Sequence, residues 1–414
     1  MTAKRWLLLA DDLTGAADSA VAFAARGLPT VVGWAGRLPE PGPGPGLFAY
    51  DGESRSLSAA DALAKRRRLA GALLPRGANL FVKIDSTLRG QPAAEIRATL
   101  EAAARLEGPV LGVLAPAFPA TGRTTLDGRV RVRGEPLEQT ELWRRDHSYP
   151  STDLAQMLAA EGLTGTKLPL AAIRAGDAAL ERALAAVDGL AVCDAATDDD
   201  LDRIARAGLR LGRPVVWIGA GGLTAALARA MPPPQSAPFP FPTSGRGVLV
   251  VVGSPAQASR VAAEHLAGLE GLIHVPIASS TLLAPGKPEN FPSHLIQALD
   301  QGTDILINLL PEDPVDFSHA PALAAALASR LQPLADHIGA LAVTGGETAA
   351  ALLTACGIDG VRLADEIEPG VSVGLSLGKR SLPLVTKAGA FGDEGVLTRA
   401  VLRLRRLNRE GYLA

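Results

Sequence analysis

The chain repeatedly places a short apolar run before a polar turn and a helical segment, and this alternation constrains its fold more than any other feature. The pattern begins at residues 5–27, where the apolar run from Trp6 to Ala10 ends on Asp11 and Asp12 and an Ala-rich helical stretch follows. Alternating strands and helices predict a mostly parallel sheet with helices on both faces. We therefore expect an α/β fold, which binds ligands at the carboxyl ends of its strands.

The length and one proline-rich segment predict two domains. A chain of 414 residues is too long for one ordinary core. Residues 231–247, MPPPQSAPFPFPTSGRG, lack periodicity and contain six prolines, which is typical of a stiff linker. We expect a first domain over 1–231, a linker over 232–247 and a second domain over 248–414, each domain a mostly parallel sheet flanked by helices.

Strands are expected in both domains. In the first they are predicted at 6–10, 30–35, 47–50, 79–84 and 109–115, with a hairpin over 128–137 and three strand–helix repeats over 167–231. In the second they are predicted at 248–252, 272–277, 305–309, 341–344 and 382–386.

Composition excludes several classes of function. The formal net charge of -2 gives no electrostatic basis for binding nucleic acid or an anionic membrane surface. Cys193 and Cys356 lie in apolar stretches, which argues against a disulfide framework and fits a reducing compartment. The first apolar run is too short for a signal peptide, and no run is long enough to span a bilayer. We expect a soluble, cytoplasmic protein with small-molecule partners.

Polar turns in the first domain are candidates for an anion site. Asp11 and Asp12 suggest proton abstraction or metal contact, and Arg55 lies at another strand-to-helix turn. After the strand at 79–84, the segment 85–90, DSTLRG, brings an acid, two hydroxyls and a guanidinium to one strand end. Such a turn suits a carboxylate or phosphate. The alternatives are a helix cap and a stabilised turn. The charged run 65–68 is expected on the solvated face of a helix.

Glycine-rich turns in the second domain predict a nucleotide site. They are Gly253-Ser254, the segment 345–348 (GGET), and the segment 387–392 (KAGAFG). Glycine allows the backbone to approach a ligand closely, and a helix N-terminus adds positive potential. Familiar motifs are absent: residues 374–380 fall short of the P-loop spacing, no GxGxxG follows a strand, no GxSxG occurs, and the six histidines lack metal-ligand spacing.

Taken together, ADDLTGAAD, SRSL, KIDSTLRG, PAFPATGRTT, TGGETA and TKAGAFG resemble the four-carbon acid sugar kinases, which are ATP-dependent kinases of threonate, erythronate and related oxo-tetronates. The resemblance extends over nearly the whole chain. It implies that the first domain binds the acid sugar, that the second binds ATP, and that the active site lies in the cleft between them. The chain departs from the family pattern at Ala17, Gln91, Pro255 and Ala390, and the first two leave the identity of the sugar acid open.

The resemblance and the turns together give two sets of candidate residues. The acid-sugar set is Asp11 or Asp12, Arg55, Lys83, Asp85, Ser86, Thr87 and Arg89. The nucleotide set is Ser254, Gly345, Gly346, Glu347, Thr348, Lys387, Gly389, Ala390, Phe391 and Gly392.

Phosphoryl transfer needs in-line positioning, charge neutralisation and a base for the attacking hydroxyl. We expect Arg55, Lys83 and Arg89 to clamp the substrate carboxylate, and Asp12 to be the base, with Asp11 and Asp85 as alternatives. Mg²⁺ would bridge the phosphates, and the sequence identifies no protein ligand for it. An NAD-linked hydroxy-acid dehydrogenase and a non-catalytic sugar-acid sensor stay open as alternatives. So do the stereochemistry of the substrate, the hydroxyl that is phosphorylated and a homo-oligomeric state.

Overall fold

The computed structural model describes residues 5–39, 45–143, 148–232, 239–283, 293–310 and 319–412. The chain forms two compact units: unit 1 comprises Met1–Thr30 and Pro41–Pro234, and unit 2 comprises Val31–Glu40 and Gln235–Ala414. Within the described ranges, no helix combines the length and apolarity needed to cross a bilayer.

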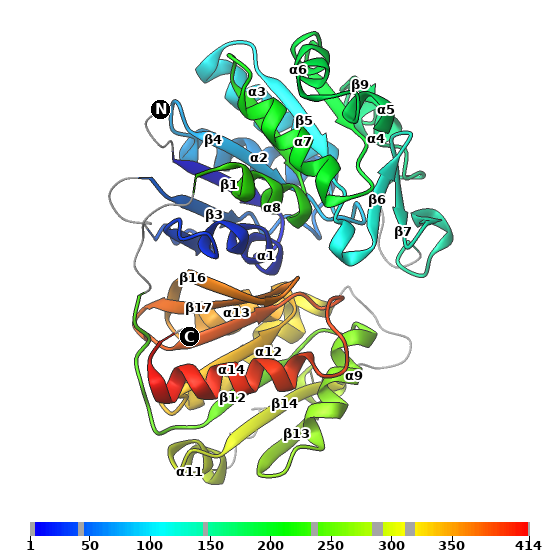
Figure 1. The fold of residues 1–414 in the computed structure, drawn as a ribbon. Coiled ribbons are helices and arrows are strands. Elements are labelled where there is room, and N and C mark those ends of the chain that lie inside the picture. Colours follow the sequence, from blue (N-terminus) through cyan, green and yellow to red (C-terminus); the bar gives the residue numbers. More distant parts are fainter. Residues whose placement is uncertain are drawn as a thin grey trace. The chain divides into compact units, whose positions relative to one another are not determined.

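Unit 1 contains a parallel sheet in the order β3-β1-β4-β11-β5-β10-β9 (Figure 1). Its strands are β1 (Trp6–Ala10), β3 (Leu47–Asp51), β4 (Asn79–Lys83), β5 (Leu111–Ala115), β9 (Gly165–Leu168), β10 (Leu190–Cys193) and β11 (Val215–Gly219). Its helices are α1 (Leu13–Ala24), α2 (Ala59–Leu73), α3 (Pro92–Glu107), α4 (Leu154–Ala159), α5 (Leu170–Ile173), α6 (Asp177–Ala185), α7 (Asp198–Leu209) and α8 (Gly221–Ala230). Helix α2 packs against α3, while α1 and α7 pack against α8. A small antiparallel sheet joins β6 (Arg123–Leu126), β7 (Arg129–Val132) and β8 (Glu135–Pro136).

Unit 2 contains a mixed sheet in the order β13-β14-β12-β15-β18-β17-β16-β2, in which the first five strands are parallel and the last three are antiparallel. Its strands are β2 (Thr30–Gly33), β12 (Val248–Val252), β13 (Leu272–Ala278), β14 (Asp304–Leu310), β15 (Ala340–Thr344), β16 (Ile358–Glu368), β17 (Val371–Gly378) and β18 (Pro383–Lys387). Its helices are α9 (Gln257–Ala267), α10 (Ser279–Leu283), α11 (Ser293–Asp300), α12 (Ala320–Leu331), α13 (Gly346–Ala355) and α14 (Val396–Glu410). Helix α9 packs against α14, and α12 packs against α13.

The α/β class is confirmed, and so are the predicted strands, except that the strand expected at 30–35 in the first domain ends at Gly33 and pairs with β16 of unit 2. The antiparallel β16–β17 hairpin is an addition that the sequence did not reveal. The side chains of β16 change from buried to only partly buried along its eleven residues, and charged residues interrupt its apolar ones. The strand therefore lacks the continuous apolar run that marks a buried parallel strand. Residues 374–378, which only partly match a phosphate loop, lie within β17.

A short N-terminal segment belongs to unit 2 rather than to the unit that surrounds it in the sequence. Val31 and Val32 of β2 pair with Arg362 and Val361 of β16. The buried Trp34 indole donates a hydrogen bond to Thr354 Oγ1 at 2.9 Å. Residues 233–238 of the predicted linker lie outside the described residues. The predicted active-site cleft between the domains stays a prediction.

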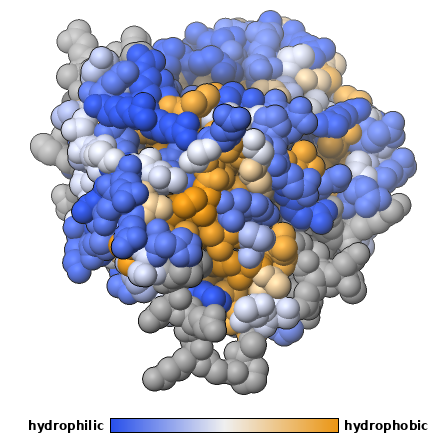
Figure 2. Space-filling model, turned by 90° about the horizontal axis from the view of Figure 1, so that it is seen from below, coloured by the Kyte–Doolittle hydropathy of each residue, from blue (hydrophilic) through white to orange (hydrophobic). Residues whose placement is uncertain are grey.

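Apolar surface gathers in the middle of the face shown in Figure 2, and hydrophilic residues surround it. Among the described residues of unit 2, the large apolar side chains with the greatest exposure are Leu38, Val261, Leu283, Leu310, Leu402 and Tyr412. None of these belongs to the three glycine-rich turns, so exposed apolar side chains do not form the candidate nucleotide site.

Candidate functional site

Three neighbouring strands of unit 1 end on charged side chains. Strand β1 pairs in parallel with β3 and β4, so their carboxyl ends meet at one edge of the sheet. Asp51 ends β3, Asp11 and Asp12 follow β1, and Lys83 ends β4 two residues before Asp85. The structure therefore brings together residues that are up to 74 positions apart in the sequence.

Arg55 connects the two carboxylates that follow β1. Its Nε and Nη2 donate to the two Asp11 carboxylate oxygens, both at 2.8 Å. Nη2 also lies 2.8 Å from Asp12 Oδ1 and 3.9 Å from Asp85 Oδ1. Because one guanidinium reaches three carboxylates, Arg55 fixes their relative positions.

Arg89 makes a second fork, to Asp85. Its Nε and Nη2 donate to Asp85 Oδ2 and Oδ1 at 3.1 and 2.8 Å, and both the backbone N–H and the hydroxyl of Thr87 donate to Oδ2. Burial alone would raise the pKa of Asp85, but Arg89, Arg55 and Lys83 outweigh it and hold that pKa well below its usual value. Ser86 is buried in the same turn. The segment 85–89 is thus a rigid turn whose arginine already binds a protein carboxylate.

Asp12 is the most exposed of the three predicted carboxylates, with 13% of its side chain accessible, against 10% for Asp85 and 3% for Asp11. It caps α1 by accepting from Gly15 N at 3.0 Å, and it accepts from Thr14 Oγ1 at 2.9 Å. Burial raises its pKa, but the positive charges of Arg55, Lys83 and Arg89 outweigh burial, so the pKa lies below its usual value. The capping interpretation of Asp12 is confirmed, and an accessible carboxylate is compatible with a second role.

Lys83 differs from the two arginines because no described residue hydrogen-bonds its ammonium, although its charge helps to lower the pKa of Asp12 and of Asp85. The residue is 4% exposed, and within the described part of the chain its ammonium makes no hydrogen bond or ion pair. A methyl group placed on Gly15 would lie 3.1 Å from Lys83 Nζ and 2.3 Å from Asp12 Oδ1, so the ammonium lies beside the capped end of α1. The ammonium of Lys83 therefore has hydrogen-bonding capacity that a ligand carboxylate can use.

Sequence reasoning missed two features of this site. Asp51 is 2% exposed and accepts from Glu53 N at 2.7 Å. Burial raises its pKa well above the usual value, and the neighbouring carboxylates of Asp12, Glu53 and Asp11 add to the rise. Asp51 lies at the end of an apolar strand, as Asp11 lies directly after one, and this position in the sequence could have identified it as a site residue.

The second missed feature is Arg66: the expectation of a solvated charged run is wrong at this residue, while Arg67 and Arg68 are exposed as expected. Arg66 is 1% exposed and lies 2.6 Å from Glu95, which is also buried. The buried residues of α2 are Ala62, Arg66 and Ala70. The spacing of four that places Arg66 on an alanine face was therefore readable in the sequence.

The three glycine-rich turns of unit 2 follow adjacent strands, because β15 pairs in parallel with both β12 and β18. They are in direct contact. A methyl group on Gly253 would lie 2.2 Å from Thr348 Oγ1, and one on Gly389 would lie 2.1 Å from Ser254 Oγ. Only glycine permits these close approaches. The structure therefore joins the three predicted turns at one sheet edge.

Lys387 hydrogen-bonds to the backbone of the Gly389 turn. It is 1% exposed, and its ammonium donates to Ser259 Oγ at 3.0 Å and to the carbonyls of Ala388 and Gly389 at 3.2 and 3.4 Å. Ser259 Oγ also donates to Gly389 O at 2.8 Å. Burial lowers the pKa of Lys387 to about 8. The hydrogen bonds of Lys387 are therefore used to hold the Gly389 turn and Ser259 in place.

The other predicted nucleotide-site residues lie around these contacts. Gly345 precedes α13 with φ of 91°, Gly346 and the exposed Glu347 open the helix, and Ala390 is exposed. Phe391 packs against Gly370, and Gly392 packs against Val396. Helix α13 begins at Gly346, and the N-terminus of a helix is suited to phosphate. The N–H of Gly345 is already used, because it donates to Lys387 O at 3.1 Å.

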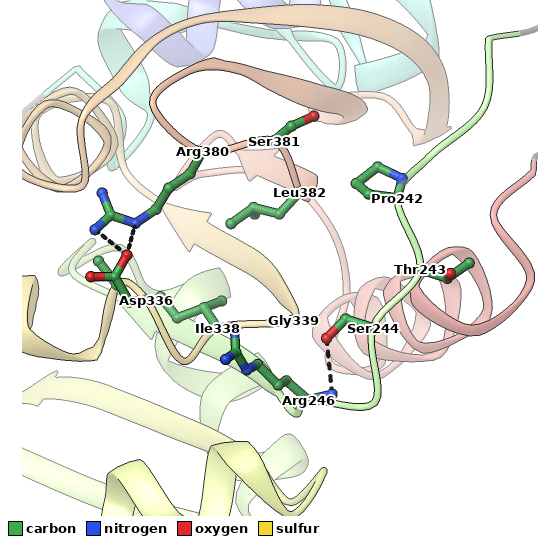
Figure 3. A pocket seen from close by; sticks show the side chains of 11 residues that line it. Pro242, Thr243, Ser244, Arg246, Asp336, Ile338, Gly339, Arg380, Ser381 and Leu382 are labelled. Atoms are coloured by element: carbon green, nitrogen blue, oxygen red, sulfur yellow. Dashed lines mark hydrogen bonds and ion pairs between the residues drawn. The ribbon is translucent and has the colours of Figure 1, made fainter.

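A cavity of about 240 Å³ in unit 2 is separate from the glycine-rich turns (Figure 3). It borders residues that precede β12, β15 and β18, namely Arg246, Gly339 and Leu382, and so lies at the opposite ends of these strands from the glycine turns. Its Arg380 is paired with Asp336 at 2.6 Å, and Arg246 with Asp300 at 3.1 Å. We therefore exclude this cavity from the candidate nucleotide site.

The chain is similar to known proteins over nearly its whole length. The chain matches a model of a sugar-binding N-terminal domain over residues 6–227 and a model of a nucleotide-binding C-terminal domain over residues 249–397. A D-threonate kinase from Cupriavidus necator is 39% identical, with 95% of this chain and 97% of the relative covered. A D-erythronate kinase from Heliobacterium modesticaldum is 30% identical, with 99% of each chain covered. A crystal structure of a protein from Salmonella typhimurium LT2 superposes with a TM-score of 0.78 at 25% identity, covering 96% of this chain and 98% of that one.

Proposed function

The chain belongs to the four-carbon acid sugar kinase family, and we propose that it transfers the γ-phosphoryl group of ATP to a hydroxyl of a four-carbon acid sugar, with D-threonate as the first candidate. Relatives named D-threonate kinase, at 39% and 35% identity, support this choice of acid over erythronate and the oxo-tetronates. Unit 1 would bind the acid sugar and unit 2 would bind ATP.

The observation that carries the proposal is the ammonium of Lys83. Arg55 and Arg89 are engaged by Asp11 and Asp85 through paired hydrogen bonds, whereas the described residues offer Lys83 no such partner. A substrate carboxylate placed there would accept a charge-assisted hydrogen bond from an ammonium that donates none to the described residues. We propose that Lys83 is the primary contact of the substrate carboxylate, and that the two arginines position the surrounding carboxylates.

Asp12 is our proposed general base. It lies beside Lys83 and is the most accessible of the three candidate carboxylates. Its lowered pKa keeps it ionised and ready to accept a proton near neutral pH. Phosphoryl transfer asks little of a base beyond orienting the hydroxyl, so a weakly basic carboxylate suffices.

On the nucleotide side, the hydroxyls of Ser254 and Thr348 and the N-terminus of α13 at Gly346 would hold the phosphates. Gly345 and Gly389 would let the phosphates approach the backbone closely, and Lys387 would hold the Gly389 turn in shape. Mg²⁺ bound with ATP would neutralise phosphate charge, and it commonly keeps phosphate and water ligands. Within the described residues no cluster of three or more His, Cys, Asp and Glu side chains could hold a metal ion, so we assign Mg²⁺ no protein ligand.

The test is ADP release measured with D-threonate, L-threonate, D-erythronate, an oxo-tetronate and the neutral alcohol threitol. We expect ATP-dependent turnover with at least one acid and a far slower reaction with threitol, because threitol leaves Lys83 without a partner. Equal rates with threitol would contradict the carboxylate contact. NAD reduction in place of ADP release would support a dehydrogenase, and binding of the acid without turnover would support a sensor.

A further inference from the structure

A buried polar network lies beneath the acid-sugar site, away from any group that would touch substrate. Arg66 of α2 and Glu95 of α3 form an ion pair at 2.6 Å, and both are 1% exposed. Such a pair is a poor source of stability, because desolvation of two charges offsets their attraction. Its presence in the core therefore calls for another explanation.

Both members of the pair contact the backbone that carries the site. Arg66 Nη2 donates to Ala10 O at 3.2 Å, and Ala10 is the last residue of β1, directly before Asp11. Glu95 accepts a hydrogen bond from the hydroxyl of Ser54, the residue directly before Arg55. The pair thus reaches both sides of the Asp11–Arg55 contact.

The same two segments are also joined to each other. The backbone N–H groups of Ser54 and Arg55 donate to Asp11 O at 3.1 and 3.2 Å. Gly52 N donates to Ala10 O at 2.9 Å. A displacement of residues 52–55 would therefore move the Arg55 guanidinium, and with it the carboxylates of Asp11 and Asp12.

We propose that the buried Arg66–Glu95 pair is a positioning device for the acid-sugar site, holding the end of β1 and the Arg55 loop in register so that Asp12 meets the substrate hydroxyl. This role rests on the proposed function. Arg66 and Glu95 touch no substrate, and they act through Ala10 O and Ser54. Apolar residues would fill the same space, but they could not accept from Ser54 or donate to Ala10 O.

The test compares two double variants on the same pair of helices. Arg66→Met/Glu95→Leu removes both buried charges and leaves no charge unpaired, so the protein should fold and melt cooperatively. Arg67→Met/Glu101→Leu is the matched control, because Arg67 and Glu101 form a partly exposed ion pair between α2 and α3 at 2.8 Å. Ser54→Ala is a third variant, which cuts the link to the Arg55 loop and leaves both charges of the buried pair in place.

We expect kcat/KM for the acid sugar to fall about 10- to 100-fold in the buried double variant, as a small misplacement of reacting groups commonly causes. Ser54→Ala should show a smaller fall in the same constant. The KM for ATP should stay near wild type in both, and the Arg67→Met/Glu101→Leu control should keep wild-type kinetics. If the pair were purely structural, its replacement would change the melting temperature. At temperatures below the melting transition, kcat/KM for the acid sugar and the KM for ATP would then stay at their wild-type values.

The two ways of failing are distinguishable. If the wild type releases ADP with no four-carbon acid, the proposed function is wrong. If the wild type is active while the buried double variant and Ser54→Ala both retain wild-type kcat and KM, the positioning role is wrong and the proposed function stands.

Discussion

The two candidate sites each contain a buried lysine at the end of a parallel strand, but the lysines are used in opposite ways. Lys83 of β4 has no hydrogen-bond or ion-pair partner in the described residues, whereas Lys387 of β18 donates to one hydroxyl and two carbonyls. The groups around the two lysines also differ. Unit 1 builds its site from charged side chains, and unit 2 builds its site from backbone turns in close contact.

This contrast teaches how each site would recognise its ligand. A small carboxylic acid is recognised by a few directed charges, so the protein must leave one of them available. Phosphates can be held by many backbone N–H groups, so the protein's own charges can be used to fix the turn that presents them. Substitutions of side chains should therefore damage unit 1 most, and added bulk on the backbone should damage unit 2 most.

The largest effect is expected from Asp12→Asn. The amide keeps the shape and can still accept from Gly15 N, but it cannot take a proton. We expect kcat to fall by about 10²–10⁴, with the melting temperature and ADP affinity near wild type. Asp153→Asn is the matched control, because Asp153 caps α4 in the same unit. An unchanged kcat in Asp12→Asn, with chemistry shown to be rate-limiting, would transfer the role to Asp11 or Asp85.

Lys83→Met should raise the KM for the acid sugar roughly 30-fold or more, because it removes the charge that pairs with the carboxylate. The free energy of unfolding should change little, since the loss of a charge that favours the ionised forms of Asp12 and Asp85 is offset by the removal of a desolvated ammonium. Chemical denaturation and steady-state kinetics on the same samples check both. Loss of stability together with an unchanged KM would mean that Lys83 supports the fold and binds no substrate.

Gly389→Ala tests the backbone site of unit 2. The added methyl would lie 2.1 Å from Ser254 Oγ and 3.0 Å from its Cβ, so the Ser254 hydroxyl must rotate away or one of the two turns must move. Overpacking of this kind costs about 1–3 kcal/mol, and we expect the Kd for ATP to rise by roughly 5- to 100-fold. Gly245→Ala is the control, because nothing lies within 4 Å of its added methyl. Wild-type ATP affinity in Gly389→Ala would show that the contact between these turns does not shape the nucleotide site.

The smallest effect concerns the pH dependence that Lys387 gives to stability. Burial lowers its pKa from 10.5 to about 8, so above pH 8 the native state loses a proton that the unfolded chain keeps until about pH 10.5. The unfolded state binds more protons in this range, and stability therefore rises with pH. Relative to Lys387→Met, the wild type should gain roughly 2 kcal/mol between about pH 8 and 10, measured by urea denaturation. A constant difference across this range would contradict the lowered pKa.

Local patterns in the sequence predicted most of the elements that carry the candidate sites. The strands at Trp6–Ala10 and Val248–Val252 are confirmed as predicted. Apolar runs bounded by polar turns suffice for such predictions, because a buried parallel strand must be apolar on both faces. The assignment of ligands to the candidate residues stays a prediction.

The sequence by itself determined the alternating α/β pattern, the positions of the strand-end turns and the resemblance to a kinase family, because each depends on residues that are neighbours in the chain. Tertiary structure alone decided which charges are available. Arg55 is bound by Asp11, and Arg66 is buried with Glu95 although it lies in a run of four basic residues. Only the parallel pairing of β1, β3 and β4 and the packing of α2 on α3 bring these distant groups together. The balance of charge, desolvation and hydrogen bonding exists only after that packing.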